Sequence, residues 1–228
     1  MSAVLITTDL RKGRRWHSQT LERGPLDGIH QVSIYPDCRY QRFEGFGGAF
    51  TEAAAHSWAQ LPEERRKAFL DCCFGPEELS YSRGRVHIGS CDFALGNYAC
   101  QSGRSDGGFD TSRDDQRLIP MILAAQETAG RPIGLLLSPW SPPGFMKTNG
   151  EMNHGGALKA EYRARWAACM ARYAAHYRAE GCDVQYLSVQ KSPPPSRPGI
   201  PASTPPGRRG SLPPGSWHPP WRRPGAAM

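Results

Sequence analysis

The chain has 228 residues, of which 39% are hydrophobic, and a formal net charge of +7. Residues 191–228 hold six Lys or Arg residues and no Asp or Glu, so that without them the net charge falls to +1. The remaining chain lacks the basic patch of a nucleic-acid-binding protein. No apolar run reaches the length that a membrane span needs. We therefore expect neither a nucleic-acid partner nor a membrane span.

The N-terminal residues and the cysteines indicate a cytoplasmic protein. Residues 1–16 contain no apolar segment followed by a small-residue cleavage site, so we expect no secretory signal. The seven cysteines are odd in number and irregularly spaced, and neither a CxxC nor an HExxH pattern occurs. We expect reduced thiols, no metal and no cofactor.

Residues 1–40 predict a small β-element, which we assign as part of a side β-domain. Residues 2–9 and 30–35 have the β-branched alternation of strands. The segment between them, residues 11–28, is mostly polar and contains Gly13, Gly24 and Pro25, so it is expected to connect the two strands.

Residues 41–190 predict four βα units in series. The expected strands cover residues 41–46, 81–88, 133–137 and 183–189, and the expected helices cover residues 51–74, 113–129 and 158–180. The first helix should break near Pro62, and Pro120 should either kink the second helix or delay its start. Strands joined by crossover helices form a parallel sheet. The fold class is α/β, and four units correspond to the N-terminal half of a (β/α)8 TIM barrel.

A glycine-rich stretch and a glutamate near the first helix are expected to have structural roles. The stretch Gly45-Phe46-Gly47-Gly48-Ala49-Phe50 fails the dinucleotide-binding fingerprint, because its third glycine position is a phenylalanine. A tight turn at a strand end is the better interpretation. Glu52 suits the start of a helix, where its charge interacts favourably with the helix dipole.

Two residues after the second and third strands are candidates for substrate binding, and an arginine lies within the second strand. Asp92 could accept hydrogen bonds from sugar hydroxyls, although an ordinary turn aspartate is equally consistent with its spacing. Trp140 offers a flat apolar face for a sugar ring, but buried packing is the more common role of such a tryptophan. Arg85 should point into the barrel or its mouth and would need a carboxylate partner, which the other strands do not obviously supply. His87, His154 and His176 are scattered, and we expect them to be structural.

Several motifs in the same order resemble glycoside hydrolase family 30, within its glucosylceramidase-like group. The resemblance covers roughly residues 5–190. Its motifs are Gly45 to Ala54, Arg85-Val86, Ser90-Cys91-Asp92-Phe93, Ser138-Pro139-Trp140-Ser141-Pro142-Pro143 and Met146-Lys147-Thr148-Asn149-Gly150.

The resemblance implies a retaining β-glycosidase that acts on a β-glycoside or glycolipid with two glutamates, in a (β/α)8 barrel with a side β-domain. It assigns substrate binding to Asp92 and Trp140, and electrostatic support of the nucleophile to Arg85. The general acid/base belongs to an Asn-Glu-Pro motif after the fourth strand, where this chain has Lys191-Ser192-Pro193. A serine hydroxyl is too weak an acid for this task. The nucleophile would lie beyond the end of the chain, so we expect no catalytic residue and an inactive polypeptide.

The departure at Ser192 coincides with a change in composition. Twelve of the 21 prolines lie in residues 191–228, which we expect to be a disordered, non-homologous tail. One base inserted into codons that can encode Lys191 and Ser192 restores Asn-Glu-Pro. Codons available to residues 196–202 then read as a stretch typical of bacterial members of the group. We therefore hypothesise a single-base deletion in the gene or in its sequencing.

A non-catalytic protein remains the alternative. The half-barrel could bind a sugar without cleaving it, or the proline-rich tail could bind a partner as a polyproline II ligand. The sequence does not indicate which sugar or aglycone is bound, nor the oligomeric state.

Overall fold

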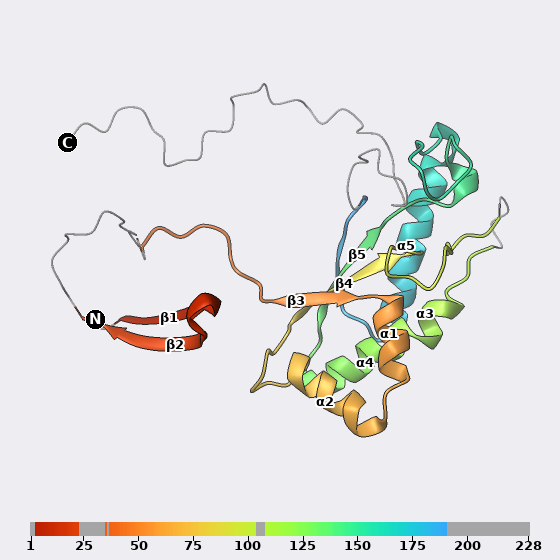
Figure 1. The fold of residues 1–228 in the computed structure, drawn as a ribbon. Helices are drawn as coiled ribbons and strands as arrows, with labels where there is room; N and C mark the ends of the chain where they lie inside the picture. The colour runs from red at the N-terminus through yellow and green to blue at the C-terminus, as the bar shows by residue number, and fades with distance from the viewer. Residues whose placement is uncertain (1–2, 23–34, 36, 104–107, 191–228) are drawn as a thin grey trace, which may run out of the picture. The chain divides into compact units, whose positions relative to one another are not determined.

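The computed structural model describes residues 3–22, 35, 37–103 and 108–190 (Figure 1). The chain divides into two compact units, residues 1–42 and 43–228. Each unit is described separately. The predicted disordered tail lies outside the described residues.

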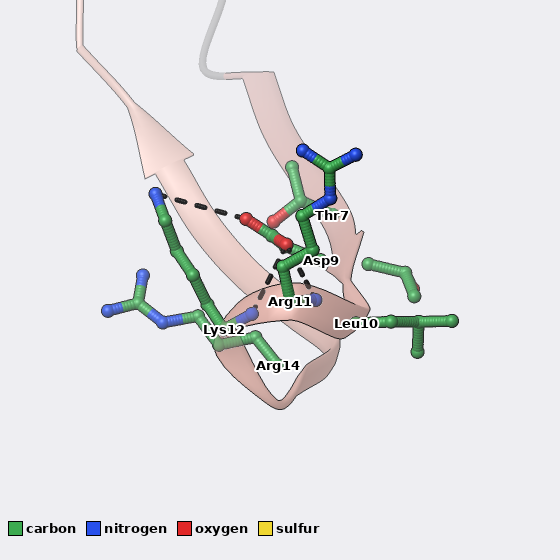
Figure 2. Close-up of a pocket in the computed structure, with 7 residues that line it drawn as sticks. Thr7, Asp9, Leu10, Arg11, Lys12 and Arg14 are labelled. Carbon is green, nitrogen blue, oxygen red and sulfur yellow. Dashed lines mark hydrogen bonds and ion pairs between the residues drawn. The ribbon is translucent and has the colours of Figure 1, made fainter.

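The first unit contains a β-hairpin. Strands β1 (Ala3–Asp9) and β2 (Arg14–Leu21) pair antiparallel, with Thr7 opposite His17. The turn between them is a short 3-10 helix, Leu10–Lys12, and Figure 2 shows that the carboxylate of its cap, Asp9, accepts the backbone N–H groups of two turn residues. The shallow hollow around this turn is lined by exposed side chains and the half-buried Asp9, so it offers no enclosed site.

The sequence patterns do not predict a strand within residues 11–28, but Arg14–Leu21 is one. All eight of its residues are exposed, so no buried face imposes the apolar alternation by which strands are recognised. The predicted strand at residues 30–35 lies, except for Tyr35, outside the described residues.

The second unit is built on a four-stranded, fully parallel sheet in the order β3-β4-β5-β6. Its strands are β3 (Gly47–Phe50), β4 (Arg83–Ile88), β5 (Gly134–Pro139) and β6 (Val184–Leu187). The connecting helices are α1 (Glu52–Ala59), α2 (Glu63–Phe74), α3 (Ser112–Gln116), α4 (Leu118–Ala129) and α5 (Arg163–Ala179). Because all three strand pairs are parallel, the carboxyl ends of the four strands lie at one edge of the sheet.

One strand and one helix differ from the sequence prediction. The strand predicted at residues 41–46 is wrong, because pairing begins at Gly47, where a Cβ would lie only 1.8 Å from the carbonyl oxygen of Arg83. This close backbone approach requires glycine and does not depend on the hydrophobic pattern that suggested the earlier start.

The break predicted near Pro62 separates α1 from α2. The helix after β4 breaks at Arg117, and Pro120 lies in the first turn of α4, where its missing N–H costs nothing.

The two faces of the sheet differ in chemistry. Alternate residues of β4 and β5 point to the helices and form the core with α4 and α5. The strands contribute Val86, Ile88, Leu135 and Leu137, and the helices contribute Leu118, Ile122 and Tyr177. The opposite face is polar. There Arg83 contacts both Glu44 and Gln185, and the Tyr186 hydroxyl donates to the Glu44 carboxylate at 2.6 Å. Large apolar side chains are exposed at both edges of the sheet, Phe46 just before β3 and Tyr186 within β6.

None of the described helices is long and apolar enough to cross a membrane.

Candidate functional site

Arg85 lies on the polar face of β4, between Ala49 of β3 and Leu136 of β5. Its Nη2 donates a hydrogen bond to Ser138 Oγ at 3.1 Å. Its guanidinium carbon lies 5.7 Å from the centroid of the Trp140 ring. Since Ser138 and Trp140 belong to the carboxyl end of β5 and the residue after it, Arg85 reaches forward to the edge of the sheet where parallel α/β folds bind ligands.

Trp140 is 9% exposed, so most of its ring is packed inside the protein, as expected of a loop tryptophan. The ring is packed against a cation, and it stands outside the main core cluster. A guanidinium over an indole face gives a cation–π attraction of about 0.5–2 kcal/mol. Arg85 therefore orients Trp140 at the mouth of the sheet.

Asp92 is exposed on the loop after β4, and neighbouring backbone groups hold that loop in place. The Phe93 carbonyl accepts the N–H of Ala53 in the first turn of α1 at 2.9 Å. The N–H of Leu95 donates to Glu52 Oε2 at 2.8 Å. The loop thus presents the Asp92 carboxylate to solvent from a fixed backbone, which a binding group requires.

Glu52 anchors this loop. Thr51 caps α1 through its hydroxyl. The side chain of Glu52, the first residue of the helix, is buried. Its Oε1 lies 2.7 Å from Arg113 Nη2 and 2.7 Å from Arg117 Nη1. Burial raises the pKa of Glu52, but the Leu95 N–H and the two arginines outweigh it, so that the pKa lies below its usual value of 4.5. Glu52 therefore stays ionised and cannot act as a proton donor at neutral pH.

His87 connects β4 to the start of α1 and to the loop after β4. Its Nε2 accepts the backbone N–H of Glu52 at 3.2 Å and its Nδ1 faces the Gly89 carbonyl, which together define a neutral ring with the proton on Nδ1. Burial lowers the pKa of His87, while Asp92 acts to raise it and Arg85 acts to lower it. The structure therefore brings the strand and the loop to one imidazole, in a structural role that agrees with the sequence expectation.

The loop after β5 is held by a buried lysine. Lys147 is fully buried, its Nζ donates to the Met152 carbonyl at 2.8 Å, and its backbone forms a bridge with Leu158. Burial lowers the pKa of Lys147 to about 8. This lysine fixes the loop that begins with Trp140 and is not presented to a ligand.

Sequence reasoning missed the partners of Glu52. Arg113 and Arg117 are more than 60 residues away along the chain, and no local pattern connects them to a helix start. The sequence shows only a glutamate at the first position of a helix, and its interaction with the helix dipole already accounts for a glutamate there. Among the described residues, no group of three or more His, Cys, Asp or Glu could hold a metal ion. Ser192 lies outside the described residues.

Arg85, Asp92 and Trp140 lie on or after the neighbouring strands β4 and β5, and they supply a guanidinium, an exposed carboxylate and an indole. Carboxylate and guanidinium exchange hydrogen bonds with hydroxyls, and an indole covers apolar C–H surface. The assignments of Asp92 and Trp140 to substrate binding, and of Arg85 to support of the nucleophile, stay predictions.

A family model described as the glycosyl hydrolase family 30 TIM-barrel domain matches residues 43–198. The crystal structure of SrfJ from Salmonella typhimurium superposes with a TM-score of 0.79 and is 36% identical, covering 90% of this chain and 46% of that one. With the parallel four-stranded sheet, these matches confirm the predicted half of a (β/α)8 barrel.

Two curated relatives are similar over most of the chain. The lysosomal acid glucosylceramidase of Mus musculus is 30% identical over 170 residues, which are 71% of this chain and 33% of that protein. The endo-1,6-beta-D-glucanase of Neurospora crassa is 28% identical over 175 residues, 73% of this chain and 36% of that protein. The chain thus spans about a third of the length of these relatives.

Proposed function

Because this chain belongs to glycosyl hydrolase family 30, we propose that it is the first half of the barrel of a retaining β-glycosidase. The chain supplies part of the sugar-binding surface, in which Asp92 accepts hydrogen bonds from ring hydroxyls and Trp140 covers the apolar face of the sugar. The names of the two curated relatives share a glucosyl unit, which favours a β-glucoside as ligand.

The contact of Arg85 with Ser138 and Trp140 is the observation that supports this function most directly. It gathers the motif residues of two neighbouring strands at the carboxyl edge of the sheet, the edge that carries the active site in barrel enzymes. In the intact barrel, Arg85 would also place positive charge next to the carboxylate nucleophile and favour its ionised form.

We further propose that this polypeptide does not hydrolyse glycosides. Retaining hydrolysis needs one carboxyl group that protonates the leaving oxygen and a second that attacks the anomeric carbon, about 5–5.5 Å apart. Ser192 occupies the position of the first, and its hydroxyl does not ionise at neutral pH. Glu52 does not replace it, because its oxygens are engaged by Arg113, Arg117 and the N–H of Leu95.

Turnover and binding of 4-nitrophenyl β-D-glucoside by the purified chain test this function. We expect binding without release of nitrophenol, and loss of binding in Trp140→Ala. Trp58→Ala is the matched control, because Trp58 lies on α1 and its indole donates to the Arg66 carbonyl. Measurable turnover would contradict the inactivity, whereas equal binding by both tryptophan variants would contradict the proposed sugar site.

A further inference from the structure

Two buried thiols meet where the loop after β4 packs against α5. The Sγ atoms of Cys100 and Cys169 are 3.0 Å apart, and the two residues are 1% and 4% exposed. Each comes from a fixed part of the backbone. The Cys100 carbonyl accepts the N–H of Asp110 at 2.9 Å, and Cys169 lies within α5. The bond length of a disulfide is about 2.05 Å, so a closing movement of about 1 Å would join them.

The environment of the two sulfur atoms is asymmetric. The hydrogen bond with Cys100 and the nearby guanidinium groups of Arg172 and Arg165 hold the pKa of Cys169 below its usual value. The hydrogen bond with Cys169, together with burial, raises the pKa of Cys100. Both arginines are fixed, Arg172 over the Phe109 ring at 4.2 Å and Arg165 by a 2.8 Å hydrogen bond to the Gly103 carbonyl. Cys169 is therefore the more readily ionised of the two thiols.

We propose that Cys100 and Cys169 are an oxidative modification site that forms a disulfide with a hydroperoxide as the oxidant. The Cys169 thiolate attacks the terminal peroxide oxygen, the O–O bond breaks, and a sulfenic acid forms. Cys100 Sγ then attacks the Cys169 sulfur and displaces the hydroxyl group as water. With hydrogen peroxide, two thiols lose two protons and two electrons, and the peroxide is reduced to two molecules of water.

The bond would tie the loop that carries Asp92 to α5. It closes a loop of 69 residues, because the two cysteines are that far apart in the chain. Restricting the unfolded chain in this way raises the melting temperature by roughly 10 °C for a domain of this size. All seven cysteines are free in the structure, as the sequence predicts, and the proposed disulfide would form only on oxidation.

Peptide mapping of the full 228-residue chain after exposure to hydrogen peroxide tests the proposal. Remaining thiols are blocked in denaturant, and the digest is analysed by mass spectrometry without reduction. We expect one dominant cross-linked pair of peptides, containing Cys100 and Cys169, that disappears on reduction. In Cys100→Ser the reaction should stop at a Cys169 sulfenic acid that dimedone captures, whereas Cys169→Ser should leave Cys100 unmodified.

Two controls separate this chemistry from general oxidation. Cys182→Ser removes another buried thiol, whose pKa burial raises to about 12, and should leave the cross-link unchanged. The same treatment in denaturant should distribute disulfides among all seven cysteines. The proposal is contradicted if Cys100 and Cys169 remain fully alkylated after native exposure, or if native and denatured chains give the same mixture.

Discussion

Two carboxylates are buried beside the helices of the same sheet, and their pKa values are shifted in opposite directions. Glu52 is 0% exposed and contacts the guanidinium groups of Arg113 and Arg117. Asp114 is 1% exposed and accepts hydrogen bonds from the hydroxyls of Tyr173 at 2.7 Å and Tyr98 at 3.1 Å. The pKa of Glu52 lies below its usual value, whereas burial raises the pKa of Asp114 to about 6 despite its hydrogen bonds.

The difference shows that the type of partner decides the ionisation state of a buried acid. The Leu95 N–H and two cations together compensate the loss of hydration of Glu52, so the carboxylate remains charged and holds the loop of Asp92. Neutral hydroxyls compensate only part of that loss for Asp114, which therefore binds a proton more readily. The first cluster is a rigid support of the candidate site, and the second responds to pH.

The largest expected effect comes from Glu52→Ala. Removal of the carboxylate leaves two half-buried guanidinium groups and the Leu95 N–H without their acceptor, which should lower the free energy of unfolding by about 3 kcal/mol. Urea denaturation followed by circular dichroism measures the change. Glu64→Ala, at an exposed position in the first turn of α2, is the control and should change stability by less than about 0.5 kcal/mol. Equal losses in the two variants would refute the anchoring role of Glu52.

The two carboxylates should give pH dependences of opposite sign. Asp114 has a folded pKa of about 6, above its usual 3.8, so its stabilising contribution is present below 3.8 and is lost as the pH rises through 6. The loss is on the order of 3 kcal/mol. Glu52 contributes stability above its usual pKa of 4.5 and loses it as the pH falls.

Unfolding free energies measured from pH 3 to pH 8 for Asp114→Asn and Glu52→Gln separate these contributions. We expect Asp114→Asn to remove the decline in stability between about pH 4 and 6 and Glu52→Gln to flatten the acid side. A profile of Asp114→Asn that runs parallel to that of the unmodified chain would show that Asp114 is not the titrating group.

A smaller effect is expected for Tyr173→Phe. The Tyr173 hydroxyl donates to Asp114 and lies within hydrogen-bond distance of the His87 carbonyl and the Tyr177 hydroxyl. Its removal should cost about 2 kcal/mol and raise the pKa of Asp114 further. Tyr177→Phe is the matched control, because its hydroxyl contacts Tyr173 and should cost about half as much. The pKa is followed by NMR titration of the Asp114 carboxyl carbon.

The smallest effect concerns the start of α1. The Thr51 hydroxyl accepts the N–H of Ala54 at 3.2 Å, so Thr51→Ala should cost about 1 kcal/mol. Thr111 precedes α3 in the same way but makes no capping hydrogen bond, and Thr111→Ala should cost less. Thermal melts of both variants test the ranking, and a larger loss in Thr111→Ala would contradict it.

The sequence predicts the elements that depend on local pattern. Three of the four strands of the parallel sheet overlap the predicted ranges, because apolar residues must face the helices at a period that the sequence displays. The strand at Arg14–Leu21 is exposed on both faces and has no such pattern, and the start of β3 at Gly47 depends on a close backbone approach to Arg83. Neither can be read from periodicity.

The sequence proposes residues for the candidate site but does not predict their contacts. Motif order identifies Arg85, Asp92 and Trp140. The stacking of Arg85 on Trp140, and the ion pairs of Glu52, join residues that lie far apart in the chain and meet only when the crossovers are folded. Asp114 has the same limitation, because its partner Tyr173 is 59 residues away.

Residues 43–190 form half of a family 30 glycosidase barrel, and we propose that its catalytic continuation is lost at Ser192. Sequencing the gene across codons 190–193, and assaying 4-nitrophenyl β-D-glucoside with the protein expressed after a one-base insertion there, tests it most directly. We predict that the insertion restores Asn-Glu-Pro and a long open reading frame, and that the longer protein releases nitrophenol while the 228-residue chain does not. Absence of any one-base change that restores this motif, or turnover by the 228-residue chain itself, would contradict the claim.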